Sequence, residues 1–383
     1  MWNKILIRKI LVLFVVGLIA TIASIDFVSI RNKKDSVVPA PSYSYKKYLS
    51  DYEPSLKDSY SDSPLLFFDS GVPGDTIFVM GGTHPNESAG ILSTYIVMEN
   101  LELERGRVIV LPIANHSAST NGLSGFAYPS SYALDTPWGK KEYKVGSRLA
   151  NPLDQWPDPV VFKQYPSGQN QSYEDARNLN RNYPGRDDGV LIERVGNAIL
   201  TMLSEENVKI AFDLHEASIT YPVNQTYIAP EKCADIAFLS SMFLSLDGLD
   251  IRVEISNEAN RGYSHSEWGR IDGLYPFLIE VPTPFIDRTP GVMSGELITK
   301  GQDDFLYGVA EKGFATVDYP KDGITIDQRC GMHLSAMKYV IDCSKELIGL
   351  DVELSWPMYQ DLVSDGIGFY LHEPDSSDSV LLI

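Results

Sequence analysis

The chain has 383 residues, of which 44% are hydrophobic, and a formal net charge of −19. This length supports one large domain with elaborations, or one domain and a small appendage. The acidic balance disfavours a nucleic-acid binder, because phosphate backbones attract basic surfaces. No Gly-x-Ser-x-Gly, His-Glu-x-x-His or phosphate-binding loop motif occurs, which disfavours serine hydrolases, helix-borne zinc proteases and nucleotide-dependent enzymes.

Residues 1–30 combine a basic flank with an apolar run from Ile10 to Ile25, followed after Asp26 by further apolar residues. We expect an uncleaved signal anchor here, with a cleaved signal peptide as the alternative. The basic flank favours a cytoplasmic N-terminus and a domain outside the cytoplasm, secreted or periplasmic if cleavage occurs. Three basic residues after the run oppose this orientation: Arg31, Lys33 and Lys34.

The remaining chain divides into three expected parts. Residues 31–70 carry Ser, Tyr, Asp and Pro with little periodicity, which predicts a linker. Residues 71–350 alternate strand-like runs with helical patterns, which predicts an α/β domain around a largely buried sheet. The expected strands are 76–80, 107–112, 208–214 and 277–281. Residues 351–383 are expected to form a β-rich tail.

His84 and Glu87 follow the first of these runs, in Gly-Gly-Thr-His-Pro-Asn-Glu. An imidazole and a carboxylate on a tight turn can converge on one metal ion, and this donor pair suits zinc. Taken alone, the spacing is more typical of a solvated surface pair. A catalytic zinc site needs a third ligand and an open position.

His215 is the candidate third ligand, because it ends another apolar run, Lys209 to His215. Ligands gather beyond the carboxyl ends of the strands of open α/β sheets. In isolation it would be read as a hydrogen-bonded histidine at a sheet edge. Either Asp213 or Glu216 could orient its imidazole through the second ring nitrogen.

Two further motifs carry polar side chains. Asn180 and Arg181 lie in a turn, and an amide beside a guanidinium is suited to binding a carboxylate; a loop arginine paired with a surface acid is the alternative. Glu280 interrupts an apolar strand, where a carboxylate is costly unless it is paired, protonated or functional. Beside a zinc-bound water it would act as the general base; a salt-bridged core glutamate is the alternative.

Together these motifs resemble the zinc carboxypeptidase superfamily, in particular its succinylglutamate desuccinylase/aspartoacylase branch. The resemblance covers about residues 74 to 285, and it implies a mixed, mostly parallel twisted sheet flanked by helices. It also implies one zinc ion, held by His84, Glu87 and His215, and hydrolysis of an amide next to a free carboxylate. The family's oxyanion-stabilising or substrate-gripping arginines have two candidates here, Arg177 for catalysis and Arg270 for substrate binding.

The implied function is a zinc-dependent deacylase of N-acyl amino acids, with Glu280 as base and Asn180 and Arg181 holding the substrate carboxylate. A metallocarboxypeptidase acting on peptides, including cell-wall peptides, is not separable from it by sequence. A non-catalytic binding member of the family and a structural surface protein are the alternatives from other classes. The expected partners are a small carboxylate substrate or short peptide and a membrane, but no nucleic acid.

Overall fold

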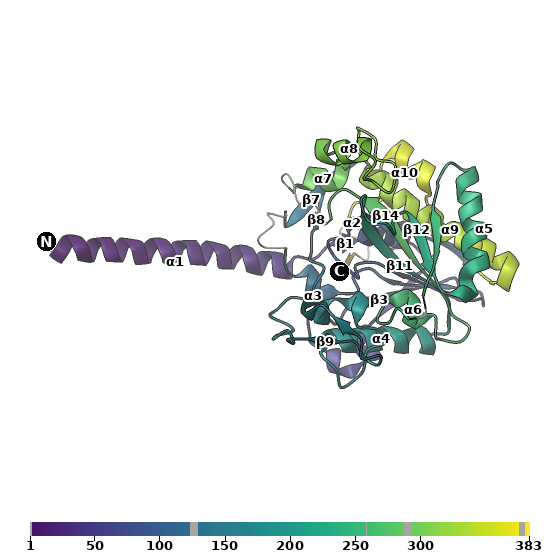
Figure 1. Cartoon of the computed structure of the whole chain (residues 1–383), viewed down its shortest axis with the longest axis horizontal. Coiled ribbons are helices and arrows are strands. Elements are labelled where there is room, and N and C mark those ends of the chain that lie inside the picture. Colours follow the sequence, from purple (N-terminus) through teal and green to yellow (C-terminus); the bar gives the residue numbers. More distant parts are fainter. Residues whose placement is uncertain (1, 123–128, 258, 287–292, 375–379) are drawn as a thin grey trace.

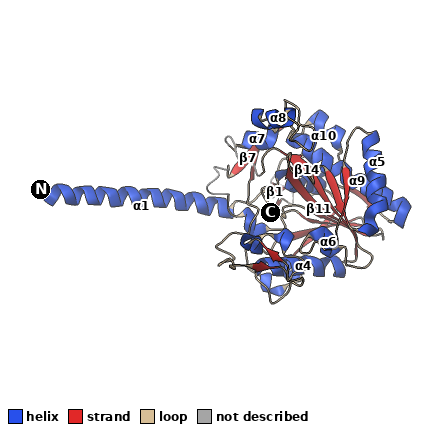
Figure 2. Cartoon of the chain, in the orientation of Figure 1, coloured by secondary structure: helices blue, strands red, loops and turns tan. Residues whose placement is uncertain are grey.

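A computed structural model describes residues 2–122, 129–257, 259–286, 293–374 and 380–383. One long helix, α1 (Trp2–Asn32), projects from a domain in which a central sheet lies between two layers of helices (Figure 1). This is the predicted α/β fold with a mixed sheet flanked by helices, and the sheet is plain in Figure 2. An apolar N-terminal helix is also present; by length and composition it could cross a membrane.

The central sheet has eight strands among the described residues. From edge to edge they are β13 (Arg252–Ile255), β12 (Thr226–Ala229), β14 (Tyr275–Thr283), β11 (Val208–Ser218), β4 (Thr76–Met80), β6 (Arg107–Leu111), β3 (Pro64–Asp69) and β2 (Tyr43–Tyr48). The central strands β14, β11, β4 and β6 run parallel, and antiparallel pairs lie outside them.

The other elements surround this sheet. The helices are α2 (Ser88–Asn100), α3 (His116–Ser119), α4 (Leu191–Glu205), α5 (Ala234–Leu246), α6 (Ser264–Trp268), α7 (Gly295–Lys300), α8 (Asp304–Glu311), α9 (Ile326–Ile348) and α10 (Tyr359–Asp365). The 3-10 helices are η1 (Leu49–Asp51), η2 (Pro54–Leu56), η3 (Tyr173–Arg177), η4 (Leu179–Arg181), η5 (Glu231–Cys233) and η6 (Ile367–Tyr370). The short strand pairs are β1 (Ser36–Val37) with β16 (Leu381–Leu382), β5 (Glu102–Arg105) with β15 (Glu353–Ser355), β7 (Ser131–Thr136) with β8 (Gly139–Lys144), and β9 (Phe162–Lys163) with β10 (Asn170–Gln171).

Both faces of β4 are buried, because successive side chains of a strand point to opposite faces. Ile77 and Val79 pack into the core shared with α2, α5 and α9. Phe78 and Met80 pack into a second core shared with α4 and α6. The uninterrupted apolar sequence of this strand is therefore the pattern of a strand covered on both sides.

The prediction of a linker over residues 31–70 is wrong for the segments that form β2 and β3. The run Leu65–Phe68 is fully buried, and Phe67 pairs with Ile109 of β6. Burial of this run outweighs the turn-forming composition around it. Only residues 33–35 separate α1 from β1. The prediction of a β-rich tail is also wrong, because residues 351–383 contain α10, η6 and only two short strands among the described residues.

A buried ion pair joins α9 to the end of β11. Arg329 Nη1 lies 2.5 Å from Glu216 Oε1, and both side chains are buried. We expect Arg329→Met to destabilise the protein by about 3–5 kcal/mol, because it leaves the Glu216 charge buried without its partner. Urea denaturation in detergent measures this change.

The matched control is Arg105→Met, which breaks the exposed Arg105–Asp351 pair. Its expected cost is only about 0–1 kcal/mol. Equal losses of stability in the two variants would contradict the role given to the buried pair.

Candidate metal centre

The turn that carries His84 begins where β4 ends at the carboxyl edge of the parallel strands. Gly82 has a φ of 61°, a conformation that favours glycine. The amide N–H of Glu87 donates to the carbonyl of His84 at 2.9 Å, which closes the turn just before α2 begins. His84 and Glu87 are buried there on one side of the turn.

His215 approaches the same point from β11, the neighbour of β4. Met80 of β4 pairs with Asp213 of β11, so His215 lies just beyond the level at which β4 ends. Its Nε2 lies 3.0 Å from Asp213 Oδ2. Of the two acids that could orient this imidazole, Asp213 does so, and Glu216 pairs with Arg329 instead.

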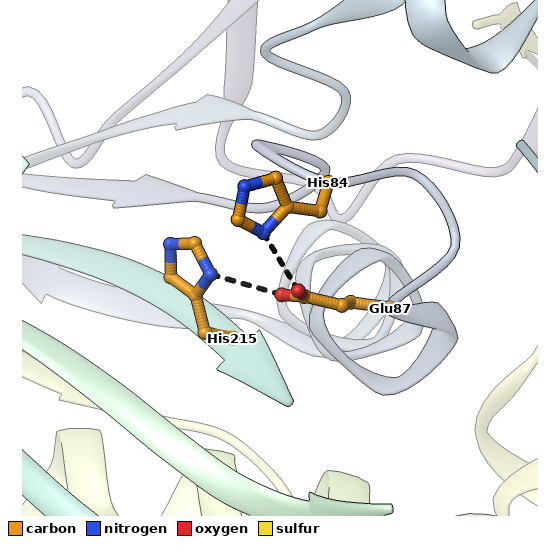
Figure 3. Close-up of side chains that lie close together, drawn as sticks. All are labelled: His84, Glu87 and His215. Carbon is orange, nitrogen blue, oxygen red and sulfur yellow. Dashed lines mark hydrogen bonds and ion pairs between the residues drawn. The ribbon is translucent and has the colours of Figure 1, made fainter. Parts of the chain in front are cut away.

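The three side chains converge, as Figure 3 shows. His84 Nδ1 lies 2.6 Å from Glu87 Oε1, and His215 Nδ1 lies 2.9 Å from Glu87 Oε2. One donor atom from each residue lies within 4.8 Å of the other two. Two imidazole nitrogens and a carboxylate at this spacing fit a zinc site with three protein ligands.

The outward-facing nitrogens of both imidazoles also lie beside side-chain oxygens: His84 Nε2 is hydrogen-bonded, and His215 Nε2 has an ion-pair contact but no hydrogen bond among the described residues. Asn178 Oδ1 lies 2.9 Å from His84 Nε2, and Asp213 fills the corresponding place beside His215. Partners of this kind fix the ring orientation of metal-binding histidines and leave Nδ1 free for the ion. Asn178 begins the Asn-Leu-Asn-Arg-Asn run that contains Asn180 and Arg181, but nothing in that pattern predicts a contact with His84.

Glu280 lies directly beside His215, because the two residues pair in register between the parallel strands β14 and β11. Paired residues of neighbouring strands point to the same face of a sheet. Glu280 Oε2 is buried and has no hydrogen-bond partner among the described residues. An unpaired carboxyl oxygen beside three ligand side chains fits a site that holds a cation and a water molecule.

The charges of the group are strongly coupled. Burial and the Arg148 guanidinium together lower the pKa of His84 to about 4, against the effect of Glu87. Burial also raises the pKa of Glu280 to about 8, against the effect of His215. Burial opposes charge on His215, but Asp213 and Glu87 outweigh it, so the pKa of His215 is raised.

These directions predict that zinc binding depends on pH. Without metal, Glu280 below about pH 8 and His215 both hold protons. A cation favours their deprotonated forms, so binding releases protons and affinity rises as the pH increases towards 8. Calorimetry near pH 7 in two buffers of different ionisation enthalpy measures the release. An affinity that stays constant between pH 6 and 8 would contradict this assignment.

Asn180 and Arg181 line the same cavity as His84 and Glu280, a space of about 500 Å³. Asn180 Oδ1 accepts from the amide of Ser264 at 2.9 Å, which fixes the turn against α6. The Arg181 guanidinium carbon lies 4.3 Å from the centroid of the Tyr263 ring. Stacking holds this guanidinium at the cavity wall.

The two other predicted arginines are not brought to this cavity. Arg177 Nε lies 2.7 Å from Asp158 Oδ1, and its Nη1 donates to the carbonyl of Ala150. Arg270 lies on the surface beside Glu267, at 3.5 Å. The catalytic role predicted for Arg177 and the substrate-binding role predicted for Arg270 do not fit these positions.

Arg148 lines the cavity instead, with Nη1 3.9 Å from Glu87 Oε1. Among the described residues it is the arginine with an ion-pair contact to the metal group, and no sequence motif predicted it. It lies in an irregular loop, where neither periodicity nor a neighbouring motif marks a functional residue. It lies within residues 118–172, a segment rich in Tyr, Trp, Pro and Gly.

No protein-family model matches the chain, and no curated protein matches it. Similar solved structures include an aspartoacylase family protein from Mesorhizobium loti, at 20% identity and a TM-score of 0.36 over 58% of this chain and 56% of that one. A succinylglutamate desuccinylase from Silicibacter sp. matches at 16% identity and 0.36 over 57% and 53%. Csd4, a D,L-carboxypeptidase from Helicobacter pylori, matches at 10% identity and 0.42 over 76% and 56%.

The family predicted from the motifs is thus found among the structural matches. Each alignment spans little more than half of the solved chain.

Proposed function

We propose that this protein is a zinc-dependent hydrolase that cleaves an amide bond next to a free carboxylate. One observation carries the proposal: His84, Glu87 and His215 converge on one point, and Glu280 pairs in register beside it. Two imidazoles, a ligand carboxylate and a separate carboxylate base are the groups that zinc-assisted amide hydrolysis needs.

When bound, zinc would supply a Lewis acid and a water molecule whose pKa falls to roughly 7. His84, Glu87 and His215 would hold the ion, and Asn178 and Asp213 would keep the two imidazoles oriented. Glu280 would accept the proton of the attacking water and deliver it to the leaving nitrogen. With a cation bound beside it, Glu280 would have its pKa lowered from the raised value, so its carboxylate form would be available.

Asn180 and Arg181 would bind the substrate carboxylate at the cavity wall, through an amide and a planar guanidinium. Because the protein carries a net charge of −19, this recognition is local and not due to long-range attraction. A substrate carboxylate held at the cavity wall would position the neighbouring scissile amide for attack beside the metal group.

A hydrolysis screen of the zinc-loaded full chain in detergent tests the proposal. The panel sets N-acyl amino acids against short peptides, including peptides with D-residues, and methyl esters of the best substrates serve as controls. We expect cleavage only where a free carboxylate adjoins the amide. Zinc content near zero after purification in zinc-containing buffer would favour the non-catalytic alternative.

Arg148 is proposed to stabilise the developing oxyanion, because it is the cavity arginine beside the metal group. We expect Arg148→Ala to lower kcat by about 10²–10³-fold with a smaller change in KM. Arg177→Ala is the matched comparison, since Arg177 pairs with Asp158 outside the cavity. A large loss of kcat in the Arg177 variant alone would reverse this assignment.

Membrane anchoring through α1 is part of the proposal. The helix is long and apolar, and its most apolar stretch is not buried against the domain. Such a surface is costly in water, and the basic residues Lys4, Arg8 and Lys9 at its start favour a cytoplasmic N-terminus. The catalytic domain would then lie outside the cytoplasm.

A further inference from the structure

Exposed apolar side chains are concentrated in the loop that precedes β9. Four of them, which we call the apolar loop patch, project into solvent: Leu153 (69% exposed), Trp156 (69%), Val160 (97%) and Val161 (53%). Single exposed apolar residues are common, and α5 carries a comparable set (Phe238, Met242, Phe243 and Leu246), so it is the place of the loop patch beside α1 that distinguishes it.

The backbone behind the patch is fixed. Gln155 is buried and donates through Nε2 to the carbonyl of Ala176 at 2.7 Å. Asp158 forms a two-point ion pair with Arg177, with distances of 2.7 and 2.9 Å. These contacts hold the backbone of the loop against the domain, and the four apolar side chains remain exposed to solvent.

The same loop is bound to the end of α1. Arg31 Nη2 lies 2.5 Å from Asp154 Oδ1, next to Leu153, and Arg31 Nη1 donates to Thr120 Oγ1 at 3.1 Å. The Arg31 guanidinium also lies 3.7 Å from the centroid of the Tyr60 ring. In Figure 1 the region of β9 lies on the side of the domain from which α1 leaves.

The length of α1 places this attachment relative to a bilayer. The apolar run from Ile10 to Ile25 and the residues after Asp26 as far as Ile30 together rise about 30 Å, at about 1.5 Å per residue, and a hydrocarbon core is also about 30 Å thick. A spanning α1 would therefore bring Arg31 to the edge of the hydrocarbon core. Asp154, which Arg31 binds, would lie at the same level, with Leu153 and Trp156 beside it.

We propose that the apolar loop patch inserts into the lipid–water interface beside α1, on the face of the membrane that carries the domain. This inference rests on the proposed anchoring by α1. Trp at the headgroup level and aliphatic side chains just below it are the residues that interfaces favour. With a net charge of −19, the protein would gain this contact by burying apolar surface and not by attraction to anionic lipids.

Site-specific fluorescence on the full chain in nanodiscs tests the proposal. Single cysteines are introduced as Val160→Cys, Leu246→Cys and Val16→Cys and labelled with an environment-sensitive dye. The native cysteines Cys233, Cys330 and Cys343 are free and buried, so labelling is directed to the new thiol. Nanodiscs of phosphatidylcholine are compared with and without phosphatidylcholine that carries a doxyl quencher on its acyl chain.

Leu246 is the matched control, because it is an apolar residue, 76% exposed, at the end of α5 on the side opposite α1. We expect the doxyl lipid to lower the emission of the dye at position 160 about twofold or more, since interfacial residues lie about 5–10 Å deep. The dye at position 246 should keep its emission. The dye at position 16 should be quenched if α1 spans the bilayer.

The outcomes separate the patch from the anchor. Quenching at position 16 with equal, weak quenching at positions 160 and 246 contradicts insertion of the apolar loop patch but supports anchoring by α1. Absence of quenching at position 16 overturns both. Quenching at positions 16 and 160 but not at 246 supports the proposal.

Discussion

Glu280→Gln is expected to retain about one zinc ion per chain and to lose turnover, with kcat lowered by about 10²–10⁴-fold. The amide has nearly the shape of the carboxyl group but cannot accept the proton of the attacking water. Glu280 is not one of the three converging ligand residues, so the metal group stays intact. Zinc content by elemental analysis and kcat on the best substrate of the screen measure the two halves of this result.

Glu346→Gln is the matched control, because it makes the same chemical change on the exposed surface of α9. It should leave both zinc content and kcat unchanged. A Glu280→Gln protein that retains full activity would remove Glu280 as the base. Loss of zinc from this variant would instead make Glu280 a ligand.

His84→Ala is expected to remove the metal and, with it, all hydrolysis. The substitution deletes one of two imidazole ligands and leaves Asn178 Oδ1 without its partner at 2.9 Å. A zinc site with only one imidazole and one carboxylate from the protein falls short of the usual three ligands. Zinc per chain after dialysis should fall from about one to near zero.

The control for this variant is His372→Ala, since His372 is exposed and lies outside the metal group. Circular dichroism shows whether each variant is folded. A folded His84→Ala protein that still holds zinc at full occupancy would place the ion elsewhere. That result would also mean that Glu280 does not act beside the bound zinc ion.

Much of the metal group was predictable because its residues follow strands that are buried on both faces. The run before His84 is apolar from Ile77 to Met80, and the run before His215 is apolar from Ile210 to Leu214 except for Asp213, so both strands can be recognised from the sequence. The carboxyl ends of neighbouring parallel strands meet at one edge of a sheet. The convergence of His84, Glu87 and His215 therefore followed from local patterns and one rule of topology.

The arginines were not predictable in the same way. Arg177 and Arg148 both lie in irregular segments, and only the fold decides which guanidinium faces the cavity. The choice of Asp213 over Glu216 as the partner of His215 depended on Arg329, which lies far along the chain and neutralises Glu216. The strands β2 and β3 were missed because turn-forming residues surround the short apolar run Leu65–Phe68.

The pairing of His215 with Glu280 has a consequence for how such a sequence can vary. Because side chains alternate along a strand, a single codon lost within the paired part of β11 or β14 would turn one of these two groups to the opposite face. A change of length in a loop carries no such penalty, because it leaves the pairing of the strands unchanged. Natural variants should accordingly carry their insertions in the connections, while the lengths of these two strands stay constant.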